Sequence, residues 1–250
     1  MSTEKQTSLP VLLSLIAVMV VPVYLYGMRP VVIALCALAT ALICDLLFKK
    51  LFHLPRKKGD WSSLSAAMMI ALMMPATVDY FVVVAAVLFG LLIAKYPFGG
   101  TGNHIFHPSA LGLAIVGLSF PEQVLAYPNP KQALDLGASI WQNADIVYAT
   151  TPASLLNVGG TPRIEWFDIL LGNFPGAMGA TCVLVLMAVL LFFCIRKIIS
   201  YKIVLSALVT AAIYVLLFPR VLTGVEYSVV YELISGVFLF GLAFLACERD

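Results

Sequence analysis

Charged residues are scarce in this chain, and their scarcity sets the class of protein. Only 11% of the 250 residues are Asp, Glu, Lys or Arg, against roughly 25% in soluble globular domains. Hydrophobic residues make up 62%, and the mean hydropathy is +1.01. A chain of this length cannot hide so much apolar surface in a water-soluble core, so we expect lipid to be its solvent. The composition predicts an integral membrane protein.

Three further absences exclude other classes. The net charge is only +2, which gives no reason to expect nucleic acid as a partner. The cysteines lie in apolar runs without a Cys-x-x-Cys pair, so neither a disulfide framework nor a cysteine-ligated metal site is indicated. A metal cluster shared with a partner subunit stays open. No small-residue cleavage pattern follows the first apolar run, which is therefore interpreted as a retained span and not as a signal peptide.

Long apolar runs dominate what is present. About eight of them are candidate membrane spans: residues 11–27, 30–48, 62–76, 78–95, 107–120, 174–195, 202–219 and 228–247. They predict an all-α polytopic protein with one membrane domain over residues 1–250. Its parts are a first helical half (1–120), a polar loop (121–173) and a second helical half (174–250).

The basic residues suggest the orientation of this domain. They cluster between the second and third spans and again between the sixth and seventh: Lys49, Lys50, Arg56, Lys57, Lys58, Arg196, Lys197 and Lys202. Both clusters fall on the side of the N-terminus, and the positive-inside rule makes that side cytoplasmic. The loop 121–173, in which acidic residues outnumber basic ones, then faces outward.

Glycine and proline are dense in residues 97–108, between two short apolar runs. Such density favours non-helical backbone inside the membrane, as in a re-entrant segment near a substrate or cofactor site. An ordinary cytoplasmic turn between two helices is the alternative.

His104 and His107 in this segment have the spacing of a shared metal site, and hydrogen bonding of exposed backbone is the other interpretation. Asp45 and Glu232 are candidates for ion handling. The alternative is that both side chains are simply exposed at the membrane–water interface.

The polar loop holds the residues of greatest chemical interest, Asp145 to Pro152. Thr151 has the features of a helix N-cap, and Pro152 those of the first helical residue. A hydroxyl at a helix N-terminus also suits a phosphate, because free N–H groups and the helix dipole favour an anion. The two interpretations are compatible.

Several segments resemble one family of membrane proteins. Residues 99–109, GGTGNHIFHPS, are similar to the GG-x-G-x-N-x-F-N-P-A segment of RnfD, from the bacterial Rnf electron transport complex, and of the related NqrB, from the sodium-pumping NADH:quinone oxidoreductase (Nqr). Residues 171–179, LGNFPGAMG, resemble the LGN-x-PG-S-x-G stretch, and residues 196–203 the basic turn after it. Residues 145–152 align with the flavin attachment site D-G-x-S-G-A-T-P, with Thr151 as acceptor.

The resemblance implies a fold and a function. The fold would be an inverted-repeat helical bundle similar to urea and ammonium transporters, with a truncated second half that lacks the last two spans. The protein would relay electrons through FMN that a flavin transferase esterifies to Thr151, with Asp145, Thr150 and Pro152 completing the site. A second flavin, riboflavin, is also implied. The partners would be the other Rnf or Nqr subunits, and Na⁺ or H⁺ would be moved across the bacterial inner membrane.

Some positions differ from the family pattern. His104 and His107 replace two asparagines, Tyr148 replaces a small hydroxyl residue, and Ala180 replaces a glutamate. The leading hypothesis is a subunit of an Rnf-type ferredoxin:NAD oxidoreductase and translocase, with Thr151 an attachment point and not a catalyst. A transporter or channel on the same scaffold without flavin, and a subunit of the NqrB type, are the alternatives.

Overall fold

The structure is a computed structural model that describes residues 4–51, 61–98, 105–138, 146–160, 164–218, 229, 231–233 and 237–245. These residues form helices joined by turns, with an isolated antiparallel bridge between Pro128 and Tyr148. The helices are α1 Glu4–Tyr26, α2 Arg29–Leu51, α3 Ser62–Met73, α4 Tyr80–Ala94, α5 Pro108–Ser119, α6 Pro121–Val124, α7 Pro152–Asn157, α8 Trp166–Leu171, α9 Val183–Ile195, α10 Tyr201–Leu217 and α12 Phe238–Phe244. The all-α prediction is confirmed for this part of the chain.

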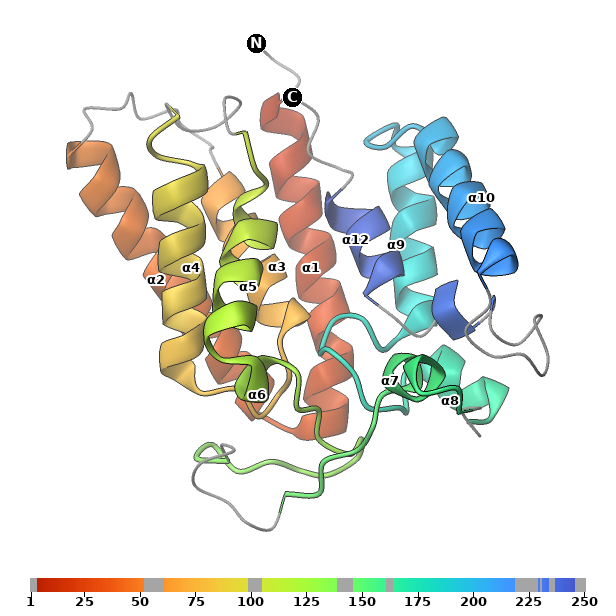
Figure 1. Ribbon diagram of the computed structural model, residues 1–250. Coiled ribbons are helices and arrows are strands. Elements are labelled where there is room, and N and C mark those ends of the chain that lie inside the picture. The colour runs from red at the N-terminus through yellow and green to blue at the C-terminus, as the bar shows by residue number, and fades with distance from the viewer. Residues whose placement is uncertain are drawn as a thin grey trace.

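Helices α1 to α5 stand side by side as one bundle (Figure 1). Helix α2 packs against α3 and α4, and α1 packs against α3. Helices α4 and α5 approach each other most closely, because glycines lie where their backbones meet. A Cβ atom at Gly90 would lie only 2.5 Å from the carbonyl oxygen of Pro108. Small residues at such an interface allow two helices to pack backbone to backbone.

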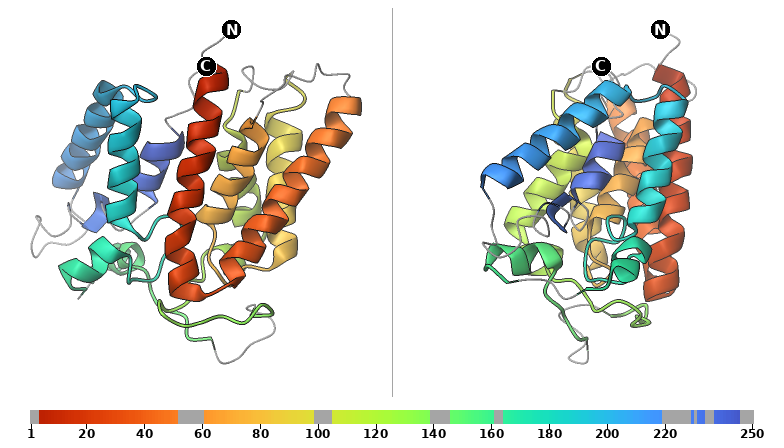
Figure 2. Two further views of the ribbon diagram at one scale, coloured as in Figure 1. Left: turned by 180° about the vertical axis from the view of Figure 1, so that it is seen from behind. Right: turned by 90° about the vertical axis from the view of Figure 1, so that its right-hand side faces the viewer.

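A second group of helices, α9, α10 and α12, lies on the other side of α1 (Figure 2). Aromatic side chains join α9 to α12: the rings of Phe193 and Phe244 meet edge to face with their centroids 5.8 Å apart. Helix α10 contributes much less to the core, since only Val204 and Val215 among its side chains are buried. The bundle α1–α5 and this second group meet along α1 and α9.

The outer surface of the helices is apolar. Leucines such as Leu35, Leu47 and Leu191 are more than half exposed on α2 and α9, and a surface of this kind is stable against lipid and not against water. Two helical stretches, Ser8–Tyr26 and Arg29–Phe48, are long and apolar enough to cross a bilayer, and five shorter apolar helices accompany them. Of the about eight predicted spans, two are thus long and apolar enough to cross a bilayer by themselves within the described residues.

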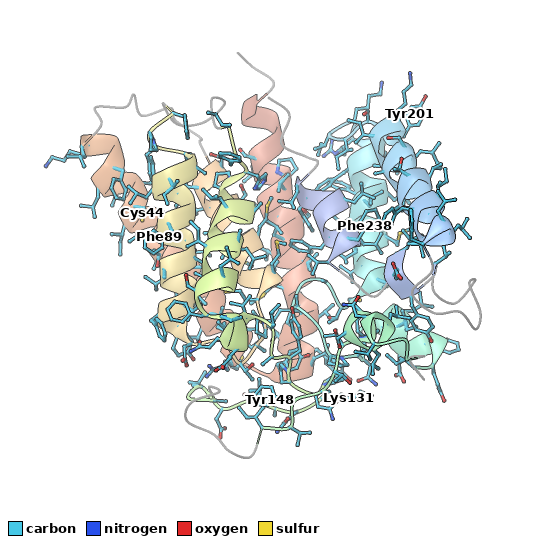
Figure 3. All side chains as sticks on the ribbon, in the orientation of Figure 1. Cys44, Phe89, Lys131, Tyr148, Tyr201 and Phe238 are labelled. Atoms are coloured by element: carbon cyan, nitrogen blue, oxygen red, sulfur yellow. The ribbon has the colours of Figure 1, made fainter. Side chains whose placement is uncertain are left out.

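The two ends of the bundle differ in character. The loop that carries Lys131 and Tyr148 lies at one end, and the turn at Tyr201 lies at the other (Figure 3). Helix α1 begins at the same end as the turn between α9 and α10 (Figure 1). The predicted arrangement, with the N-terminus and the basic turn on one side and the polar loop on the other, agrees with this geometry.

Two buried segments within the bundle are not helical, and both correct the predicted spans. Helix α3 ends at Met73, before the predicted end at 76, and the buried chain continues with an extended residue at Met74 and a turn at Ala76 and Thr77. The predicted span 174–195 is wrong in its first nine residues, because Pro175 and two glycines favour turns and α9 begins only at Val183. The two segments bind each other: the amide of Met178 donates to the carbonyl of Met74 at 3.1 Å.

Residues 99–104, the middle of the segment 97–108, lie outside the described residues, so its re-entrant conformation stays a prediction. Helix α4 ends at Ala94 and α5 begins at Pro108, on either side of it. The predicted last span, 228–247, is described at residues 229, 231–233 and 237–245, which include α12. The inverted-repeat arrangement and the division at residues 120 and 173 also stay predictions.

Candidate functional site

The chain that leads to Thr151 is held in place by pairing with an earlier part of the same loop. Tyr148 and Pro128 form the antiparallel bridge. The amide of Asn129 donates to the carbonyl of Val147 at 3.0 Å, and the amide of Ala149 donates to the carbonyl of Tyr127 at 3.1 Å. These bonds fix the direction in which the chain arrives at residue 150.

This paired loop is attached to the bundle at the end of the non-helical segment 74–79. The Thr77 hydroxyl, which is fully buried, donates to the carbonyl of Ala126 at 3.3 Å. Gln123 and Asp79 bind each other twice, through the Gln123 amide to the carboxylate at 2.8 Å and through the Asp79 backbone N–H to the Gln123 side chain at 3.2 Å. The loop therefore rests on the same non-helical segment that interrupts the core.

Arg29 is the centre of this attachment, although it is only 1% exposed. Its Nε donates to the carbonyl of Ala76 at 2.7 Å, and its two terminal nitrogens donate to the carbonyls of Val78 at 3.0 Å and Leu136 at 2.5 Å. The guanidinium also lies 5.1 Å from the ring centre of Tyr80. One buried cation thus joins α2, the non-helical segment 74–79 and the loop through backbone oxygens.

Tyr148 lies where the loop meets this cation. Burial raises the pKa of the Tyr148 phenol, while its interactions with Thr77 and with the positive charge of Arg29 act in the opposite direction. Burial also raises the pKa of the neighbouring Tyr127. Both phenols are therefore neutral at physiological pH, and they present aromatic surface beside the candidate site without adding negative charge.

Thr151 is the N-cap of α7, as the sequence predicts. Its Oγ1 accepts a hydrogen bond from the backbone N–H of Ser154 at 3.1 Å, and the Ser154 hydroxyl donates to the Thr151 carbonyl at 2.8 Å. Pro152 is the first helical residue and is buried. This capping geometry holds the Thr151 side chain in one place.

The surroundings of Thr151 fit attachment of a phosphate group. The side chain is half-buried, and its neighbours Thr150 and Ser154 are exposed, so a modifying enzyme can reach this edge of the loop. Backbone N–H groups at the start of a helix favour a bound anion, and the N–H of Ser154 here already binds Thr151 Oγ1. Thr150, Thr151 and Pro152 lie together, whereas Asp145 lies outside the described residues.

A second polar cluster, absent from the sequence-based site, lies within the bundle α1–α5. Asp45 of α2 accepts hydrogen bonds from the hydroxyls of Ser63 and Tyr96, each at 2.6 Å. Lys95, only 2% exposed, donates to Ser63 at 2.5 Å and to Ser62 at 2.6 Å. Asp45 is thus linked to a buried ammonium through one serine, and simple interfacial exposure is not its environment.

This linkage gives a prediction for Ser63. We expect Ser63→Ala to lower the free energy of unfolding by about 2 kcal/mol, because both a carboxylate and an ammonium lose a buried partner. Ser65→Ala is the matched control, since the Ser65 hydroxyl is also buried but donates only to the nearby Ser62 carbonyl. Thermal unfolding of both variants in detergent measures the difference. Equal effects would show that the Asp45–Lys95 link adds nothing.

The predicted histidine pair is not assembled by the described residues. His107 caps α5, and its Nδ1 accepts from the backbone N–H of Ser109 at 3.3 Å, which confirms the backbone-bonding interpretation for this histidine. His104 lies outside the described residues. Within the described ranges, no group of three His, Cys, Asp or Glu side chains has the geometry to hold a metal ion. Glu232, the second predicted candidate for ion handling, is partly buried.

Sequence patterns could have pointed to some of the residues that were missed. Arg29 is an isolated cation between two long apolar runs, and Lys95 ends another such run. Ionisable residues in these positions require partners inside the protein. Their partners are not visible in the sequence. Arg29 binds oxygens that lie 47 to 107 residues away, and no local pattern specifies contacts at that separation.

Comparison with known proteins finds relatives that are subunits of Na⁺-translocating NADH-quinone reductases. It is 29% identical over 192 residues to NqrB of the Na⁺-translocating NADH-quinone reductase of Chromohalobacter salexigens, an alignment that covers 73% of this chain and 44% of the relative. The corresponding protein of Pseudoalteromonas atlantica is 28% identical over 73% of the chain and 44% of the relative. That of Klebsiella pneumoniae is 27% identical over 73% and 45%.

These alignments span less than half of the curated relatives' length. The model of the NQR2, RnfD, RnfE family, in contrast, matches nearly the whole chain, from residue 1 to residue 249. The resemblance to this family is thereby confirmed, and the chain belongs to the NQR2, RnfD, RnfE family.

Proposed function

We propose that this protein is a flavin-bearing membrane subunit of a redox-driven, ion-pumping electron transport complex. Family membership and the names of its relatives support the general class. Thr151 carries the specific proposal, because its Oγ1 is fixed as the cap of α7 at an accessible edge of the loop. FMN would be bound there through a phosphoester bond to that oxygen.

In this proposal the flavin supplies the electron-transfer chemistry, and the chain supplies its position. Thr151 would hold the phosphate, with Thr150 and Pro152 shaping the turn around it and Asp145 preceding it. The bridge at Tyr148 and the hydrogen bonds of Arg29 keep this loop on the bundle. A rigid support matters, because electron transfer requires a constant distance between the attached group and its partner.

The membrane orientation belongs to the same proposal. The bundle places the start of α1 and the α9–α10 turn at one end and the loop at the other (Figure 1). With Arg196, Lys197 and Lys202 on the cytoplasmic side of the inner membrane, the positive-inside rule puts Thr151 on the outer side. A flavin transferase acting there would complete the protein.

Further details of the complex extend the proposal. An Rnf-type assembly would pass electrons from ferredoxin to NAD and move Na⁺ or H⁺, with the other membrane subunits as partners and riboflavin as a second flavin. The names of the relatives, which specify Na⁺ translocation and NADH-quinone reduction, are compatible with an Nqr-type assembly as well. A flavin-free transporter is the second candidate, favoured by the contact between the two non-helical segments, which join at Met74 and Met178.

The test of this proposal is covalent flavin on Thr151. We expect a fluorescent band in a denaturing gel when the protein is co-expressed with an active flavin transferase, and we expect Thr151→Val to abolish it. Because that change also removes the cap of α7, Thr151→Asn is the sharper variant: Asn caps helices well but has no hydroxyl to esterify. Thr151→Ser, which keeps both features, is expected to stay fluorescent.

Thr150→Val distinguishes the two neighbouring hydroxyls. Retained fluorescence in this variant supports Thr151 as the acceptor, and its loss there, with fluorescence kept in Thr151→Asn, moves the attachment to Thr150. A wild-type protein that stays dark, while a control substrate of the same transferase is labelled, would reject the flavin proposal and favour the transporter.

A further inference from the structure

We propose that the seam between α1 and α9 is a binding site for one anionic phospholipid, with an acyl chain in the groove and the phosphate on Arg196. The groove has a volume of about 620 Å³. It lies along the contact between the bundle α1–α5 and the second group of helices, on the opposite side of α1 from α2 (Figure 2). The site is independent of the flavin proposal.

Two antiparallel stripes of apolar residues form the walls of the groove. Each stripe repeats at intervals of four residues, which places its members on one face of a helix: Leu9, Leu13 and Ala17 on α1, and Leu184, Ala188 and Phe192 on α9. Ala17 and Ala188 are small, so the two helices leave a gap between them. The hydroxyl of Ser14, which also lines the groove, donates to the carbonyl of Val11 at 2.7 Å and offers no unsatisfied donor to a ligand.

The length of the groove matches one leaflet of a bilayer. From Leu9 to Ala17, α1 rises about 12 Å at ~1.5 Å per residue. Along α9 the distance from Leu184 to Arg196 is about 18 Å by the same measure. One leaflet of the hydrocarbon core is about 15 Å deep, half of the usual thickness. A single acyl chain that lies along this groove would therefore reach the interface beside Arg196.

Arg196 gives the groove its preference for an anion. It is the charged side chain among the lining residues, and it stands at the end of α9 where the groove opens. Its guanidinium lies 5.7 Å from the ring centre of Phe192, and within the described part of the chain no carboxylate pairs with it. Lys202 lies nearby, at the start of α10, but does not line the groove. Basic residues at the mouth of a groove between membrane helices bind phospholipid head groups.

The proposal can be tested by native mass spectrometry of the purified full-length chain, titrated with phosphatidylglycerol or phosphatidylcholine in detergent. We expect wild type to bind phosphatidylglycerol about fivefold more tightly, the value that one basic residue at an anionic surface provides. Arg196→Gln is expected to remove this preference. Ala188→Leu is expected to weaken both lipids, because it fills the groove without changing a charge.

Lys202→Gln is the matched control, since it removes a nearby positive charge, at the start of α10, from a residue that does not line the groove. It is expected to leave the preference unchanged. Equal losses in Lys202→Gln and Arg196→Gln would show diffuse surface attraction and overturn the site. Unaltered binding in Ala188→Leu would place the lipid elsewhere. Loss of lipid when partner subunits are added would show that a helix of a partner fills the groove, which also overturns the proposal.

Discussion

Gly112→Ala is expected to destabilise the bundle by about 2–3 kcal/mol, the usual cost of forcing extra atoms into a packed core. A Cβ atom at Gly112 would fall on the carbonyl oxygen of Ala86, and the side chain of Ile70 would lie 3.1 Å away. The obstacle is backbone, which cannot rotate aside, so α4 and α5 would have to separate. Thermal unfolding in detergent, followed by tertiary circular dichroism, measures the loss.

Gly117→Ala provides the matched control on the same helix. A Cβ at Gly117 meets nothing within 4 Å, so this change brings only the higher helix propensity of alanine, worth up to ~1 kcal/mol. The two substitutions are therefore expected to have opposite signs. Similar unfolding temperatures for both variants would show that α4 and α5 are not in backbone contact at Gly112.

Arg29→Met is expected to lower the stability by about 4 kcal/mol, since it removes several hydrogen bonds from a charged donor, each worth roughly 1.5–3 kcal/mol. The carbonyls of Ala76 and Val78 would lose a partner in a buried place. The loop would also lose its bond at Leu136. We expect a lower unfolding temperature and, where Thr151 carries flavin, a decrease in labelling because its loop is no longer held.

Arg29→Lys separates charge from geometry. Lysine keeps the positive charge but has no planar fork to reach both the segment 74–79 and the loop, so we expect only partial recovery of stability. Lys131→Met, which removes an exposed cation from the same loop, is expected to change little. Full recovery with lysine would mean that the charge alone, and not the set of five carbonyl contacts, gives Arg29 its role.

Local signals explain which predictions succeeded. Low charge and long apolar runs predicted a helical protein with an apolar exterior, and the α1 and α2 spans follow the predicted 11–27 and 30–48 closely. Thr151 and Pro152 were predicted as cap and first helical residue, because capping depends on bonds between residues three positions apart. The family segments were likewise contiguous in sequence.

The positions at which α3 and the predicted span 174–195 are interrupted could not be predicted from such local signals. Residues 97–108 have the highest density of glycine and proline, yet the described non-helical backbone inside the core is at Met74 and at Phe174 to Thr181. Hydropathy alone extends both spans through these residues, because they are apolar. Pro75, Pro175 and two glycines disfavour helix at these places. The backbone groups that this leaves free pair with each other, since the amides of Met178 and Gly179 bind carbonyls at the end of α3.

The sequence by itself determined the class of this protein, its family and the local geometry at Thr151. Only the tertiary structure decided that Arg29 holds the loop on the core, that Asp45 and Lys95 share Ser63, and that Arg196 stands at the end of an apolar groove. The physical reason is the range of the interactions. Hydropathy and capping act over a few neighbouring residues, whereas a buried charge takes its partners from segments that folding brings together.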